Sequence, residues 1–78
     1  MAIRFSLDQL LVLEAIERTG TFAGAAKELH RVPSAVSYGI RTLEESLGLA
    51  LFDRSGRKAR LTPAGQQFVA EGAELLAS

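Results

Sequence analysis

The sequence predicts a mainly α-helical domain that carries one small β-hairpin. Four segments repeat apolar residues at helical spacing. Each begins after a capping residue or at a proline, and two of them end at a glycine. A short stretch before the last segment alternates instead, as paired strands do. Because 78 residues with 47% hydrophobic content can bury one core and little else, we expect a single domain.

The first helix is predicted to follow Ser6 and to end at Gly20. The Ser6 hydroxyl can accept from a free amide while Gln9 reaches back, which is the pattern of a capping box. Gly20 suits a left-handed helix end. Thr21 then caps a second helix from Phe22 to Leu29, whose small alanines favour close packing.

A third helix is predicted to begin at Pro33, after a three-residue connection. Proline lacks a backbone N–H, and an N–H in the first turn of a helix would have no partner within the helix. It is expected to end at Gly48. Its apolar stripe has the spacing of a helix packed on one side. The stripe consists of Val36, Ile40, Leu43 and Leu47.

The remaining residues indicate a hairpin and a fourth helix. Residues 51–54 and 59–62 read as two short strands around a turn at residues 55–58. Pro63 begins a fourth helix, whose apolar side chains still recur at the last residue. We therefore expect the chain to be a piece of a longer protein.

The charges cancel overall but are unevenly distributed. Nine cationic and nine acidic residues give a net charge of zero, yet residues 27–60 hold seven cations against four acids. Without cysteine there is no disulfide and no thiolate metal site, and no export signal or membrane span is evident, so we expect a cytoplasmic protein. Nothing resembles a catalytic constellation or a phosphate-binding glycine loop, so we expect neither an enzyme nor a cofactor.

The second and third helices, joined by a short turn, have the organisation of a helix-turn-helix, which sets its second helix into the major groove of DNA. The polar outer face of the third helix suits base edges. The hairpin forms a basic wing that can reach phosphates or the minor groove, and the free amides after Thr21 can bind a further phosphate. The expected phosphate or minor-groove contacts are Thr21, Arg31, Arg41, Arg54, Arg57, Lys58 and Arg60.

The order of the blocks along the chain resembles the amino-terminal domain of LysR-type transcriptional regulators. The resemblance extends from about Leu7 to the end, and the combination is far more specific than any one block. The blocks are residues 21–30 (TFAGAAKELH), 34–37 (SAVS), 40–44 (IRTLE), 47–48 (LG), 51–54 (LFDR) and 61–65 (LTPAG).

The resemblance implies a winged helix-turn-helix over residues 1–62, with a three-helix core, a recognition helix at 33–47 and a wing at 51–62. Residues 63–78 then start a long linker and dimerisation helix, and the effector-binding domain that takes the small molecule lies outside the chain. A homodimer on a palindromic operator is implied, with higher oligomers possible for the whole protein. The implied base contacts are Pro33, Ser34, Ser37 and Tyr38, and the implied dimer contacts are Ala64, Phe68, Leu75 and Leu76.

Two departures from the family pattern fall at base-reading positions. Residues 32–34 are Val-Pro-Ser where many members have Ser-Gln-Pro, and residues 38–39 are Tyr-Gly where Arg-Gln is common. They leave the operator sequence open. Gly39 should cost the helix about 1 kcal/mol relative to alanine. One hypothesis is that its missing side chain allows a close approach to the DNA backbone.

Simpler interpretations stand beside these. The apolar seam of the fourth helix can be plain core, the wing cations can be a solvated loop, and His30 is better explained by a helix end than by metal or proton chemistry. Glu44 is expected at the surface, facing Arg41 or the wing. The rival function is a winged helix that binds proteins, which would expose a continuous apolar patch on the third helix.

Overall fold

The computed structural model describes the backbone of residues 6–77 and the side chains of residues 6–75. Within that part the predicted elements are confirmed. They are α1 (Leu7–Thr19), α2 (Phe22–Glu28), α3 (Pro33–Leu47), β1 (Phe52–Asp53), β2 (Arg60–Leu61) and α4 (Pro63–Ala77).

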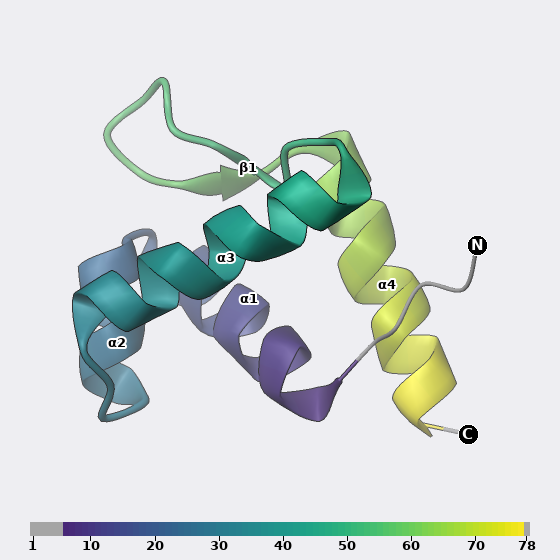
Figure 1. The fold of residues 1–78 in the computed structure, drawn as a ribbon, viewed down its shortest axis with the longest axis horizontal. Helices are drawn as coiled ribbons and strands as arrows, with labels where there is room; N and C mark the ends of the chain where they lie inside the picture. Colours follow the sequence, from purple (N-terminus) through teal and green to yellow (C-terminus); the bar gives the residue numbers. More distant parts are fainter. Residues whose placement is uncertain (1–5, 78) are drawn as a thin grey trace.

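The helices enclose one core, and the hairpin projects from it. α1 and α3 lie between α2 and α4, and the hairpin loop extends along one edge (Figure 1). β1 and β2 are antiparallel, with Phe52 opposite Leu61 and Asp53 opposite Arg60. Each helix and both strands contribute to the core or pack against it. The buried cluster comprises Val12, Leu13, Ala15, Ile16, Ala25, Ala26, Val36, Ile40, Leu43, Leu51, Phe52, Ala59 and Phe68.

Capping residues set three of the helix starts. The hydroxyls of Ser6, Thr21 and Thr62 accept from backbone amides three residues on, at 3.0, 2.8 and 3.0 Å. The capping box at Ser6 is incomplete, because the buried Oε1 of Gln9 has no hydrogen-bond partner. α3 starts without a side-chain cap, at the predicted proline.

The turn between α2 and α3 is closed by a left-handed residue. His30 has φ 57° and is the one non-glycine residue of the described chain with a positive φ. Its N–H donates to the carbonyl of Lys27 (3.2 Å), and the N–H of Arg31 donates to that of Ala26 (2.8 Å). These two bonds form a Schellman motif, which ends α2 and redirects the chain into α3.

The start of α4 is packed tightly against the chain before β1. A Cβ added to Gly65 would lie 2.2 Å from the carbonyl oxygen of Leu51, so only glycine fits there. Nearby, the N–H of Thr62 donates to that same carbonyl (2.9 Å), and the Thr62 hydroxyl donates to the carbonyl of Ala50 (2.7 Å).

Among the described residues, no helix combines the length and apolar character needed to cross a membrane.

Candidate nucleic-acid interface

The first half of α3 presents polar side chains on an accessible face. Because a helix turns by about 100° per residue, burying Val36 and Ile40 directs Ser34, Tyr38 and Arg41 outward. These three are exposed, Tyr38 to 71%. Ser37 is half-buried on one flank of this face, and Pro33 is exposed at the helix start. The predicted base-reading residues therefore lie together at the accessible end of α3.

The wing is fastened to α3 by a carboxylate. Oε2 of Glu44 accepts from the N–H groups of Leu51 (2.7 Å) and Phe52 (3.3 Å). Its Oε1 accepts from Nη2 of Arg54 at 3.4 Å. Of the two neighbours expected for Glu44, the wing is the correct one.

Arg54 is exposed but is engaged by other residues of the fold. Besides its pair with Glu44, its guanidinium lies 4.5 Å from the centre of the Phe22 ring, a cation–π contact. That ring packs edge-on against Phe52, with centroids 5.7 Å apart. Arg54 therefore joins the wing to α2 as well as to α3, which the count of cations in the sequence could not reveal.

The second strand of the wing is fastened to α1. The N–H of Ala59 donates to the carbonyl of Gly20 (2.8 Å), and the N–H of Leu61 donates to Oε2 of Glu17 (3.0 Å). The methylenes of Lys58 cover Gly20, whose added Cβ would come within 3.0 Å of Cδ. Glu17 was not anticipated, since no local pattern relates residues 44 positions apart.

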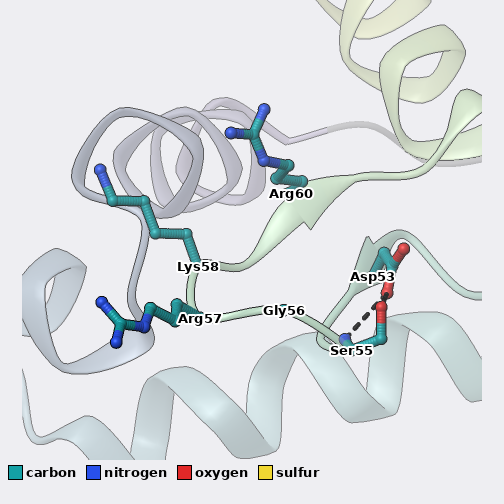
Figure 2. A pocket seen from close by; sticks show the side chains of 6 residues that line it. All are labelled: Asp53, Ser55, Gly56, Arg57, Lys58 and Arg60. Carbon is teal, nitrogen blue, oxygen red and sulfur yellow. Dashed lines mark hydrogen bonds between the residues drawn. The ribbon is translucent and has the colours of Figure 1, made fainter.

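The tip of the wing is shaped by Asp53, which accepts from the backbone N–H (2.9 Å) and hydroxyl (2.7 Å) of Ser55. These bonds favour the charged carboxylate and lower the pKa of Asp53 below its ordinary value. Figure 2 shows Arg57 and Lys58 extending from the turn away from this bond. They border a hollow of about 340 Å³, lined by Asp53, Ser55, Gly56, Arg57, Lys58 and Arg60.

Four of the predicted DNA-binding cations are exposed and have no ion pair among the described side chains: Arg41, Arg57, Lys58 and Arg60. Arg31 differs, because its guanidinium binds the carboxylate of Asp8 on α1. The hydrogen bonds of this pair lower the pKa of Asp8 and raise the pKa of Arg31. Both side chains are exposed, so this ion pair contributes little to the stability of the fold.

Thr21 lies beside the wing. A shallow hollow of about 220 Å³ separates the start of α2 from the turn, and its lining includes Thr21, Phe22, Arg54 and Arg57. The Thr21 hydroxyl accepts a hydrogen bond as the cap of α2, and its own O–H remains able to donate.

The predicted dimer residues are placed differently from one another. Phe68 is 6% exposed and belongs to the core, so the core interpretation holds for it and little of its surface remains for a partner. Ala64 is half-buried, whereas Leu75 is 59% exposed. The side chain of Leu76 lies outside the described residues.

Within the described part, no group of three His, Cys, Asp or Glu residues could hold a metal ion.

Comparison with known families and proteins agrees with this geometry. Residues 7–66 match the model of the bacterial regulatory helix-turn-helix proteins of the lysR family. The chain is 49% identical over 71 residues to the probable HTH-type transcriptional regulator YhaJ of Escherichia coli, covering 91% of the chain and 24% of that protein. It is 56% identical over 63 residues to the HTH-type transcriptional regulator PunR of Escherichia coli, covering 81% and 20%. The chain thus spans about a quarter or less of these relatives.

Solved structures show the same fold. The BenM_DBD/catB site 1 DNA complex superposes with a TM-score of 0.81 at 32% identity, covering 94% of this chain and 81% of that one. The CbnR_DBD-DNA complex gives a TM-score of 0.80 at 33% identity, covering 94% and 84%. The winged helix-turn-helix prediction is therefore confirmed.

Proposed function

The chain belongs to the LysR family of bacterial regulatory helix-turn-helix proteins, and we propose that it binds duplex DNA sequence-specifically as part of a transcriptional regulator. The observation that carries the proposal is the juxtaposition of α3 with the wing. The exposed hydroxyls and Arg41 of α3 lie on the helix whose flank holds β1 through Glu44. Two similar structures were solved as DNA complexes.

In this proposal α3 enters the major groove and the wing lies beside it. Hydroxyls can donate to or accept from base edges, so Ser34, Ser37 and Tyr38 specify the sequence, together with Pro33 at the helix start. The free cations bind phosphates, which fixes the register. Arg57 at the tip is better placed than Arg54 to enter the minor groove, because Arg54 is held by Glu44 and Phe22.

For the whole protein we propose a non-enzymatic, cytoplasmic regulator that acts as a homodimer through α4 on a palindromic operator. Its effector domain would lie outside the 78 residues. The support is the family match and the short share of the relatives that the chain spans. The exposed Leu75 on α4 provides surface for a second copy. A two-fold dimer calls for half-sites separated by whole helical turns.

The test is a fluorescence anisotropy titration of this chain with a duplex selected from a random pool, a scrambled duplex and several salt concentrations. Arg57→Ala should weaken binding to both duplexes and lower the slope of log K against log salt by about one. Ser37→Ala should leave the slope unchanged and cost about 1–3 kcal/mol of discrimination. The two variants control for each other, because one should change the salt dependence of binding and the other the discrimination between the two duplexes.

The rival function, a winged helix that binds proteins, predicts a different result. Val32 and Tyr38 are exposed on or beside α3, to 63% and 71%, but Ser34, Ser37 and Arg41 interrupt any apolar patch. If neither substitution alters affinity for any duplex, the assignment of the DNA-contacting residues is wrong. If the parent chain binds no duplex, the protein-binding interpretation replaces the DNA proposal.

A further inference from the structure

Glu44 occupies the junction between the recognition helix and the wing, yet none of the proposed DNA contacts uses it. Its side chain is 17% exposed and lies on α3. One oxygen accepts from two backbone N–H groups at the start of β1, and the other pairs with Arg54. A carboxylate with these three donors fixes the approach of one element to another.

We propose that Glu44 is a positioning residue that sets the wing at the distance from α3 at which both contact one duplex. The inference rests on the proposed function. Burial of Leu51, Phe52 and Ala59 holds the base of the wing against the core. The wing beyond this base needs a further device, because each strand is two residues long and a two-stranded hairpin has marginal stability by itself. Its ladder alone cannot hold the tip at a fixed place.

The two strands are held by different elements, which separates positioning from folding. Besides the buried side chains of Leu51 and Phe52, the β1 side of the wing is held by Glu44, directly and through Arg54, which extends the link to Phe22 on α2. β2 depends on α1, through the bonds of Ala59 to Gly20 and of Leu61 to Glu17. Loss of the Glu44 carboxylate should therefore loosen the β1 side of the wing while the contacts of the β2 side remain.

The experiment measures operator affinity for Glu44→Ala and Glu44→Gln in this chain. Without the carboxylate the tip samples positions away from the DNA, so Glu44→Ala should bind about tenfold more weakly, with a salt slope lower by about one. Glu44→Gln keeps an acceptor for the amides but loses the charge facing Arg54, so its loss should be smaller, about threefold.

A double-mutant cycle with Arg57→Ala distinguishes positioning from general damage. If Glu44 acts through the wing tip, adding Glu44→Ala to Arg57→Ala should weaken binding by less than about twofold. Glu45→Ala is the matched control, since Glu45 is the next residue on α3, exposed, and no hydrogen bond to its side chain is found among the described residues. The affinity of the Glu45→Ala variant for the operator should stay within about twofold of that of the parent or become tighter.

Amide exchange in the free protein supplies a readout that does not depend on DNA. The N–H groups of Leu51 and Phe52 should exchange faster in Glu44→Ala, while that of Ala59, bound to Gly20, should not. Additive losses in the cycle, or an unchanged affinity, would overturn the positioning role. If Glu44→Ala does not fold, Glu44→Gln carries the same cycle. A parent chain that binds no duplex would overturn the proposed function itself.

Discussion

At the scale of single residues, His30 has an unfavourable backbone conformation that the turn between α2 and α3 requires. It is an L-residue with φ 57° at the position of a Schellman motif that glycine usually occupies. The left-handed conformation costs such a residue roughly 1–2 kcal/mol. The bonds from His30 and Arg31 to the end of α2 hold it there, because they set the direction in which α3 leaves.

Replacing His30 by glycine should stabilise the fold. We expect His30→Gly to raise the free energy of unfolding by about 0.5–1 kcal/mol, since relief of the left-handed strain exceeds the extra entropy of an unfolded glycine. Urea denaturation followed by circular dichroism measures the change. His30→Asn should fall between, because asparagine tolerates this conformation better than most residues. A His30→Ala protein more stable than His30→Gly would contradict the explanation.

At the scale of the elements, two glycines inside helices have opposite roles. Gly65 in α4 lies so close to the Leu51 carbonyl that an added Cβ would overlap it, at 2.2 Å. Gly39 in α3 is exposed, and an added Cβ would meet nothing within 4 Å. Packing thus requires the first glycine, whereas the fold alone gives no reason for the second.

The two alanine variants form a matched pair. Gly65→Ala should lower the free energy of unfolding by about 1–3 kcal/mol through overpacking. Gly39→Ala should raise it by about 1 kcal/mol through helix propensity. Thermal and urea denaturation compare them. If the missing Gly39 side chain allows α3 to approach the DNA backbone, Gly39→Ala should also weaken operator binding. Unchanged binding by the stabilised variant would remove that hypothesis.

The elements were predictable because their signals are local. Capping hydroxyls, the proline at residue 33 and the glycines at residues 20 and 48 mark helix boundaries within one turn, and the structure confirms them. Glu44 was expected to face Arg41 or the wing, and it does face the wing. The partners of the other charged residues were not predictable. Arg31 pairs with Asp8, 23 residues away, and Glu17 holds Leu61, so only the packed helices bring them together. Sequence therefore indicated a basic surface but not which cations remain free on it.

At the scale of the whole molecule, α4 divides along its length between core and open surface. At about 100° per residue, Ala64, Phe68 and Leu75 share one face of this helix. Near the helix start that face is occupied, since Phe68 is buried in the core. Near the helix end the same face carries Leu75 at 59% exposure. In the proposed homodimer, we expect a second copy to contact this end of α4.

A charge at this end of α4 should therefore weaken the association of two copies but leave the affinity of a single copy for DNA unchanged. We expect Leu75→Glu to reduce affinity for a palindromic duplex by about tenfold, because a buried carboxylate in an apolar contact is costly, while affinity for a single half-site stays unchanged. Sedimentation velocity and anisotropy on the two duplexes measure both quantities. Ala73→Glu introduces the same charge on the opposite, exposed face and should bind as the parent does. If Leu75→Glu still binds the palindrome cooperatively, dimerisation does not run through this face of α4.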